Sequence, residues 1–263
     1  MDLIKQIFHK ATNIVSPDTL ELIFFPKKDP KAEYPLKTIR YFTHFDQIPT
    51  ILAHSQYVAC STACHMNVQG DLLSRHQLEN VVLAKILTLD VDLDNLRKQL
   101  NFTECSCGEE KKCCKICWRL MAQPLMVEIE IYFKRFLNSS ILFNYSGNKG
   151  FHGRALNAAL STLSPQNRLT ILNHMEQWLK TKLPTLFNNL SIVVDIFDKL
   201  ITTQLIHPLK LIYTAHPTSG FLALPITPLI NFENLSFRIQ DFNPAVHLQI
   251  LEQRNQIVKK LLE

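Results

Sequence analysis

The amino-acid sequence predicts an α+β fold, because segments with strand periodicity and segments with helical periodicity alternate along the chain without internal repeats. The expected strands cover residues 36–42, 87–93 and 141–145, and the expected helices cover 2–15, 46–54, 118–137, 154–163, 165–182, 190–205 and about 244–263. With 263 residues, 46% of them hydrophobic and 19% charged, the chain is long enough to bury a full core. No apolar run in it is long enough to span a bilayer.

The segment Leu87-Thr-Leu-Asp-Val-Asp-Leu93 gives the first indication of a functional site. Strand geometry sends its apolar side chains to one face and Asp90 and Asp92 to the other. Two adjacent carboxylates repel each other unless a cation lies between them, and oxygen ligands on a rigid strand suit Mg²⁺ or Mn²⁺. We therefore expect a divalent metal site here, and the alternative is a solvated edge strand with an acidic outer face.

The cysteines predict a second, structural metal site. Five of the seven lie between Cys105 and Cys117, which is too dense for a disulfide framework in a chain of this size and favours a reducing compartment. A Cys-x-x-Cys pair beside a turn glycine and lysines predicts tetrahedral zinc, with free or redox-active thiols as the alternative. The expected ligands are Cys105, Cys107, Cys114 and Cys117, with Cys113 as the alternate.

A glycine-containing loop follows the expected strand 141–145 and reads Ser146-Gly-Asn-Lys-Gly-Phe-His152. Its glycines allow backbone N–H groups to approach phosphate oxygens, and Lys149 and His152 add charge-assisted donors. The spacing differs from that of a Walker A loop. The loop predicts a phosphate site, and the alternative is an ordinary strand-to-helix turn.

Two further features lie in the C-terminal half. The turn Pro217-Thr-Ser-Gly220 predicts a hairpin between residues 209–216 and 221–226. Asp195 and Asp198 would share one face of the expected helix 190–205. Their apolar neighbours indicate burial, where a carboxylate needs a metal or a cationic partner. The alternative is a buried ion pair with a nearby lysine.

In this order the motifs resemble those of the catalytic small subunit of archaeo-eukaryotic DNA primases. The matching features are the D-x-D strand, a cysteine knuckle ending in Cys-Trp, a Tyr-Ser-Gly-x-x-Gly-x-His loop, and His-x-Leu-Lys followed by His-Pro-x-x-Gly. The resemblance runs from Arg40 to residues 241–244. It implies one catalytic domain over residues 1–263, with mixed sheets flanked by helices, a zinc element at about 103–119 and a small helical insertion at about 154–205. The short insertion resembles compact viral members, such as the primases of large insect DNA viruses.

The resemblance also implies roles for individual residues. In the family, two strand aspartates and a third downstream aspartate hold the catalytic metals; Asp90 and Asp92 match the first two. The third precedes the hairpin histidine by 18 residues, and 216 − 18 = 198 favours Asp198 over Asp195. The implied contacts to the nucleotide triphosphate are Arg40, Ser146, Gly147, Lys149, His152, Lys210 and His216. Two arginines of the family loop are replaced here by asparagine and lysine, which keeps one charge and loses bidentate geometry.

The implied reaction is template-directed synthesis of short RNA primers on single-stranded DNA, with Mg²⁺ or Mn²⁺ as catalytic ions and Zn²⁺ as a structural ion. The implied partners are the template, nucleoside triphosphates, a large primase subunit and replication proteins, without a membrane. The implied location is the nucleus or another intracellular replication site. A net charge of +5 permits a polyanionic partner. The alternatives are a weak or inactive zinc-bearing subunit that binds nucleic acid, and a primase-fold DNA polymerase acting in repair.

Overall fold

The structure, a computed structural model, describes residues 20–26, 38–42, 55–60, 63–65, 82–102, 113–187, 194–204, 209–210, 216, 219 and 221–230. The strands are β1 (Leu20–Pro26), β2 (Thr38–Phe42), β3 (Ser55–Cys60), β4 (Ala63–His65), β5 (Val82–Lys85), β6 (Thr88–Asp92), β7 (Ile141–Tyr145), β8 (Gly150–Ala155), β9 (Leu209–Lys210) and β10 (Leu224–Ile226). The helices are α4 (Leu93–Gln99), α6 (Lys115–Cys117), the π-helix η2 (Trp118–Ala122), α7 (Gln123–Phe136), the 3₁₀-helix η3 (Ala158–Thr162), α8 (Pro165–Lys182), α9 (Pro184–Phe187) and α10 (Lys199–Thr203).

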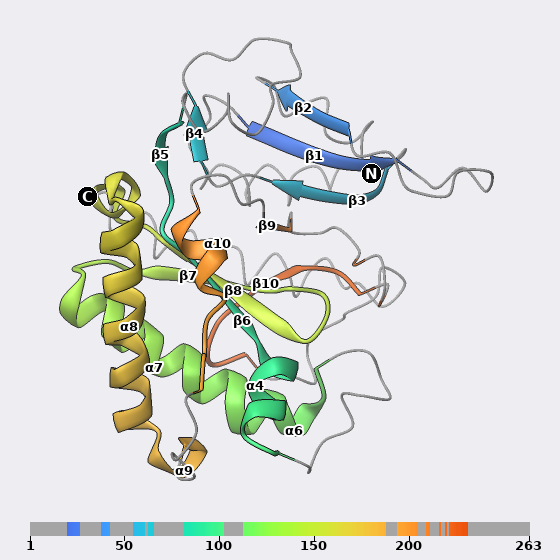
Figure 1. Cartoon of the computed structure of the whole chain (residues 1–263). Helices are drawn as coiled ribbons and strands as arrows, with labels where there is room; N and C mark the ends of the chain where they lie inside the picture. The colour runs from blue at the N-terminus through green and yellow to red at the C-terminus, as the bar shows by residue number, and fades with distance from the viewer. Residues whose placement is uncertain are drawn as a thin grey trace.

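The chain forms an α+β fold in which two four-stranded sheets have the orders β2-β1-β3-β9 and β10-β7-β8-β6. A separate pair joins β4 to β5. Figure 1 shows the first sheet above the second, with α7 and α8 beside the second. Every strand pairing in the described part of the chain is antiparallel, whereas mixed sheets were expected. The turn from β7 to β8, residues 146–149, is too short for parallel pairing of these two strands.

The core lies between the second sheet and helices α7 and α8. Leu89 and Val91 of β6 are fully buried, as the alternation in the sequence predicts. They belong to one apolar cluster with Phe151 of β8 and with Ile129 and Phe133 of α7. Full burial of side chains of this size contributes roughly 1.5–3 kcal/mol each. This burial fixes which face of β6 points away from the core.

Helix α8 was predicted correctly, including its first residue. The hydroxyl of Ser164 accepts a hydrogen bond from the backbone N–H of Asn167 at 3.2 Å, and Pro165 occupies the first turn. Proline is well suited to that position because the N–H it lacks has no partner within a helix.

Pro124 does not interrupt the helix that is expected over residues 118–137. Helical backbone runs from Lys115 to Phe136, and the π-helix η2 ends at Ala122, two residues before the proline. The N–H of Gln123 bonds to the carbonyl of Trp118, five residues back. The wider π turn accommodates a proline that would otherwise clash with the preceding turn.

Two other predictions about helices are wrong. Residues 154–163 do not form a helix, because β8 continues to Ala155 between two partner strands and only the short η3 follows. Residues 194–198 are not helical either, and α10 begins only at Lys199. In both places, pairing with the second sheet overrides the local apolar spacing.

The hairpin expected between residues 209–216 and 221–226 is described only in part, because residues 211–215, 217, 218 and 220 lie outside the described residues. Strand β9 pairs with β3 of the first sheet, and β10 pairs with β7 of the second. The backbone N–H of His216 bonds to the carbonyl of Phe221 at 2.7 Å. The expected strand 36–42 corresponds to β2. The expected helices 2–15, 46–54 and 244–263 lie outside the described residues. Among described residues, no helix combines the length and apolar character that crossing a membrane requires.

The close pairing of β6 with β8 depends on Gly150, and this can be tested. A Cβ atom added there would lie against the carbonyl oxygen of Val91, a rigid backbone atom. Gly150→Ala is therefore expected to lower the free energy of unfolding by roughly 2 kcal/mol or more, measured by urea denaturation.

Gly153→Ala is the matched control on the same strand. The added Cβ would meet the terminal carbon of the Ile141 side chain at 2.6 Å, and that atom can rotate away. The loss should therefore be clearly smaller than for Gly150→Ala. Equal losses from the two variants would contradict the proposed backbone contact.

Candidate functional site

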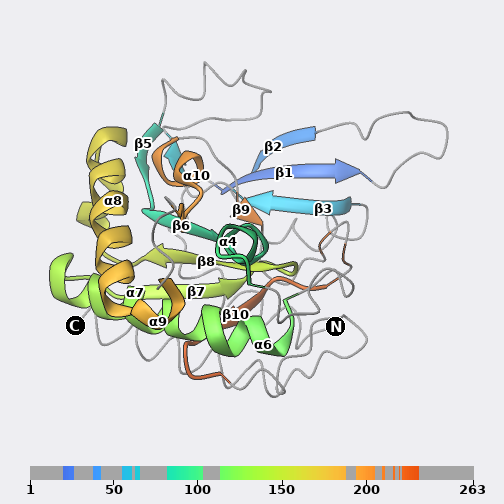
Figure 2. The same cartoon turned by 60° about the horizontal axis from the view of Figure 1, so that its bottom comes forward.

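Pairing of β6 with β8 brings the D-x-D strand beside the glycine-containing loop. Asp90 lies opposite His152 and Asp92 lies opposite Gly150. Figure 2 shows β8 between β7 and β6, with α4 at the end of β6. The loop that joins β7 to β8 therefore lies at the end of the second sheet where Asp92 lies opposite Gly150.

Asp90 lies in an acidic and largely enclosed environment. Its side chain is 22% exposed, and its Oδ1 atom is 3.6 Å from Nε2 of the buried His152. Burial, followed by the charges of Asp198 and Asp92, raises the pKa of Asp90 to about 7. The three aspartates predicted from the sequence are thus close enough for their charges to interact.

Asp92 and Asp198 each cap a helix. Oδ1 of Asp92 accepts hydrogen bonds from the backbone N–H groups of Asp94 and Asn95, at 2.9 and 3.2 Å. Oδ1 of Asp198 accepts from Leu200 and Ile201, at 3.0 and 3.4 Å. Both side chains are therefore held in fixed orientations at the starts of α4 and α10. Neither capping role was predicted.

The helix α10 is attached to β6 along its length, and this attachment positions Asp198. The backbone N–H of Asp198 bonds to the carbonyl of Asp90 at 3.0 Å. The hydroxyl of the buried Thr202 donates to the carbonyl of Thr88 at 2.6 Å. The side-chain nitrogen of Lys85, on the neighbouring strand β5, donates to the carbonyls of Ile201 and Gln204 at the end of the helix.

Asp195, the alternative third aspartate, lies in a different environment. Its side chain is 57% exposed and its Oδ1 atom is 2.8 Å from Nζ of Lys199. Its backbone N–H bonds to the side-chain oxygen of Gln99. Asp195 and Asp198 do not share a helix face, because residues 194–198 are not helical. Asp195 therefore pairs with a lysine, but in an exposed position, and the burial expected from its apolar neighbours is not found.

A divalent cation suits this acidic cluster by charge and by donor type. Burial and the charges of Asp198 and Asp92 raise the pKa of Asp90, and a bound cation would stabilise its ionised form; carboxylate oxygens are ligands for Mg²⁺ and Mn²⁺. Within the described part of the chain, however, no three His, Cys, Asp or Glu side chains are gathered closely enough to form a complete ligand set. Closer approach of these side chains would be required for binding.

The loop from Ser146 to Lys149 is a strand-to-strand turn that satisfies its own backbone. The Ser146 hydroxyl accepts from the N–H groups of Asn148 and Gly150, at 3.3 and 3.2 Å. Gly147 has a φ of 77°, which favours glycine. The hydroxyl of Ser219 donates to the carbonyl of Gly147 at 2.5 Å. A bound phosphate would have to compete with Ser146 for these N–H groups.

Lys149 is tied to α4 twice. Its carbonyl accepts from the N–H of Leu93 at 3.0 Å, and its Nζ atom lies 3.3 Å from Oδ2 of Asp94. Asp94 also contacts Arg97 at 2.8 Å and Lys98 at 2.9 Å. Partial burial acts to raise the pKa of Asp94, but hydrogen bonds from Lys98, Arg97 and Lys149 outweigh it and lower the pKa to about 2. The sequence reasoning missed Arg97 and Lys98, although their position directly after the D-x-D strand was a usable signal.

The remaining predicted nucleotide contacts lie on other elements. The backbone of Arg40 is opposite Leu22 in β2, and that of Lys210 is opposite Ala59 in β9. These two strands are the opposite edges of the first sheet, three strand spacings or roughly 14 Å apart. His216 is partly buried at the turn before β10.

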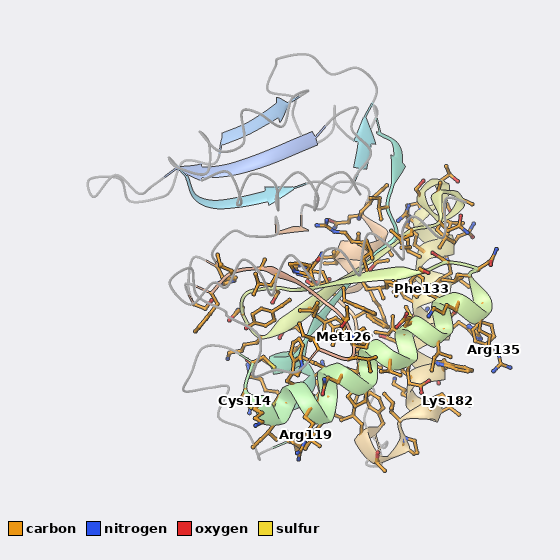
Figure 3. All side chains as sticks on the ribbon, turned by 180° about the vertical axis from the view of Figure 1, so that it is seen from behind. Cys114, Arg119, Met126, Phe133, Arg135 and Lys182 are labelled. Carbon is orange, nitrogen blue, oxygen red and sulfur yellow. The ribbon has the colours of Figure 1, made fainter. Side chains whose placement is uncertain are left out.

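The cysteine element contacts the same loop. Cys113, Cys114 and Cys117 are buried, and the N–H of Cys117 donates to Sγ of Cys114 at 3.4 Å. The N–H of Cys113 bonds to the carbonyl of Asn148 at 2.9 Å. Figure 3 shows Cys114 at the start of the long helix that runs to Arg135. Cys105 and Cys107 lie outside the described residues, so the proposed set of four ligands is described only in part.

Comparison of the sequence with protein-family models and with curated proteins finds no match.

The attachment of α10 through Lys85 predicts an unusual dependence of stability on pH. Lys85 is almost completely buried, and burial together with the charge of Arg168 lowers its pKa from 10.5 to about 7. Between these values the unfolded chain holds a proton that the folded protein lacks, so the free energy of unfolding rises with pH. Relative to Lys85→Met, the wild-type protein should gain about 3 kcal/mol between pH 7 and pH 10. Urea denaturation of both proteins across this range would measure the difference, and a constant difference would contradict the shifted pKa.

Proposed function

We propose that this protein is the catalytic subunit of a DNA primase, which synthesises short RNA primers on a single-stranded DNA template. The observation that carries the proposal is the attachment of Asp198 to Asp90 through a backbone hydrogen bond of 3.0 Å. It unites a D-x-D strand with an aspartate more than one hundred residues later. The pKa of Asp90 is raised by burial and then by the charges of Asp198 and Asp92. Zinc at the cysteine element, Mg²⁺ or Mn²⁺ at the aspartates, and a large subunit as partner belong to the same proposal.

The chain's own residues divide the work of nucleotidyl transfer. Asp90, Asp92 and Asp198 would hold the catalytic divalent ions, which lower the pKa of an attacking 3′-hydroxyl and stabilise charge on the phosphate under attack. The helix caps keep Asp92 and Asp198 oriented before substrate binds. Lys149 lies in the loop before β8 and His152 lies on β8, and both would neutralise charge on phosphate oxygens. Arg40, Lys210 and His216 would contribute further contacts to the triphosphate.

A second function is favoured by one specific observation. Ser146 already occupies the backbone N–H groups of its loop, and Lys149 already contacts Asp94. This arrangement would also suit a zinc-bearing subunit that binds nucleic acid and has little catalytic activity. The deciding experiment incubates purified protein with a single-stranded DNA template, labelled ribonucleotides or deoxyribonucleotides, and Mg²⁺ or Mn²⁺. Extension products favour the primase, and template binding without products favours the second function.

Asparagine variants test the acidic cluster with little disturbance of the fold. Asn is as good a helix cap as Asp, so Asp92→Asn and Asp198→Asn should keep α4 and α10 while removing a charge. Each of these variants, and Asp90→Asn, is expected to lower nucleotide addition by roughly 100-fold or more. Asp195→Asn is the control, because that side chain is exposed and paired with Lys199. Near-normal activity in Asp198→Asn together with loss in Asp195→Asn would overturn the choice of the third aspartate.

Elemental analysis tests the zinc element. Protein purified without chelators is expected to contain one zinc ion per chain, and Cys114→Ala should lose it together with part of its thermal stability. Cys64→Ala, outside the cysteine cluster, is expected to keep the metal. Wild-type protein without zinc would contradict the assignment of this element.

A further inference from the structure

Four ring-bearing side chains meet where α7 and α8 are in contact, and we call them the α7–α8 aromatic group. Tyr132 and Phe136 come from α7, and His174 and Trp178 come from α8. The ring centre of Phe136 lies 5.5 Å from that of His174 and 5.2 Å from that of Trp178, both in edge-to-face geometry. The hydroxyl oxygen of the buried Tyr132 lies 2.7 Å from Nδ1 of His174, a hydrogen-bond distance. These contacts hold the rings in fixed relative positions.

Two cationic side chains lie over the rings of this group. Cζ of Arg135 is 5.4 Å from the ring centre of Phe136 and 5.5 Å from that of Trp178. Nζ of Lys182 is 4.7 Å from the ring centre of Trp178. Both cationic side chains are exposed, and neither forms an ion pair with a carboxylate. Positive charge that no acidic partner neutralises therefore lies directly beside the rings.

The group also presents ring surface to the solvent. Phe136 is 44% exposed, more than any other Phe, Tyr or Trp side chain in the part of the chain that the structure describes. His174 is exposed and Trp178 is partly buried. A ligand could therefore contact both the rings and the two cations at once.

Helix α8 separates this group from the acidic cluster. The residues that α8 contributes, together with Lys182, are spaced four apart and share one face of the helix. Glu176 lies on the opposite face, where its Oε1 atom accepts from the N–H of Ile196 at 3.1 Å, two residues before Asp198. The aromatic group and the segment that leads to Asp198 thus lie on opposite sides of a helix that is roughly 10–12 Å thick.

We propose that the α7–α8 aromatic group binds single-stranded DNA together with Arg135 and Lys182, with a base stacked against Phe136 and the neighbouring phosphates beside the two cations. Sites for single strands combine aromatic surfaces on which bases stack with positive charge along the backbone. An acidic side chain of a polypeptide would use the charge but brings no flat ring to Phe136. The identification of the strand as the template rests on the proposed function. From its place on α8, the group would hold a part of the template away from the reacting nucleotide.

The test compares two strands with the same number of phosphates, an oligothymidylate and an abasic strand that lacks bases, by fluorescence anisotropy with the full chain. Phe136→Leu keeps an apolar side chain without a ring, so it should weaken oligothymidylate binding about fivefold or more and leave abasic binding unchanged. Arg135→Gln should weaken the binding of both strands several-fold. Both altered side chains are exposed, so the variants are expected to fold.

Matched controls lie at the other end of the same helical run. Arg119 and Leu120 are exposed and lie about sixteen residues before Arg135 and Phe136, roughly 24 Å along the axis, as the labels of Arg119 and Arg135 in Figure 3 indicate. Arg119→Gln and Leu120→Ala should bind both strands as the wild type does. Losses in these controls equal to those in the Arg135 and Phe136 variants would indicate a general basic surface and overturn the proposal.

Tryptophan emission gives a second, independent measurement. The chain contains two tryptophans, of which Trp118 is fully buried and Trp178 belongs to the aromatic group. Saturation with oligothymidylate should quench the emission of the wild type and should not quench that of Trp178→Phe. Unchanged emission of the wild type at saturation would contradict a strand at this site.

Two further titrations separate this proposal from its rivals. Polyglutamate binding that Arg135→Gln abolishes, with oligothymidylate binding unchanged, would reassign the group to an acidic polypeptide. Asp90→Asn, which tests the proposed reaction, should bind oligothymidylate as the wild type does. A protein that never polymerises but shows the expected losses in the Phe136 and Arg135 variants would refute the reaction and retain the binding site.

Discussion

The register between β6 and β8 is the constraint on which the rest of the site depends. Asp90 lies opposite His152 and Asp92 opposite Gly150, while Leu89 and Val91 are buried beneath. A slip of one residue would turn both aspartates into the apolar core and expose two buried side chains, which burial energetics forbid. Because β8 follows the loop directly, the same register also sets the position of Lys149. Strand pairing thus places the acidic strand and the basic loop together.

Acidic side chains at the end of β6 lie next to basic side chains on α4. The acidic cluster of Asp90, Asp92 and Asp198 is followed, two residues after Asp92, by Asp94, which contacts Arg97, Lys98 and Lys149. A ligand that combines a divalent cation with a polyanion would be complementary to both parts at once. Neither part alone is unusual in a protein surface, but their adjacency on β6 and α4 matches the charge pattern of a metal-bound nucleotide.

Local signals in the sequence were sufficient where a single element determines its own structure. The alternation around Asp90 gave the buried and exposed faces of β6, and Ser164 with Pro165 gave the start of α8. The errors lie where distant segments compete. Residues 154–155 extend β8 because β6 and β7 offer backbone partners on both sides. The segment around Asp198 is extended because its N–H bonds to Asp90, and no local pattern encodes a contact over that distance. For the same reason no local pattern predicts the contact between Lys149 and Asp94.

Among the three aspartates, Asp90 carries the strongest argument for a function. Asp92 and Asp198 cap helices, and capping by itself is a sufficient structural reason for an aspartate at each position. Asp90 caps nothing in the described contacts, lies largely enclosed beside two other carboxylates, and has a pKa near 7 as a result. Asparagine or serine at this position would remove that repulsion, so stability alone favours a neutral residue. The surroundings of Asp90 destabilise its ionised form, and a bound ligand that stabilises this form would account for an aspartate here. A divalent cation would do so by lowering the pKa of Asp90 and neutralising the charges of Asp92 and Asp198. Asp90 is therefore the member of the acidic cluster that argues most strongly for metal-dependent chemistry, because no structural role in the described contacts accounts for it.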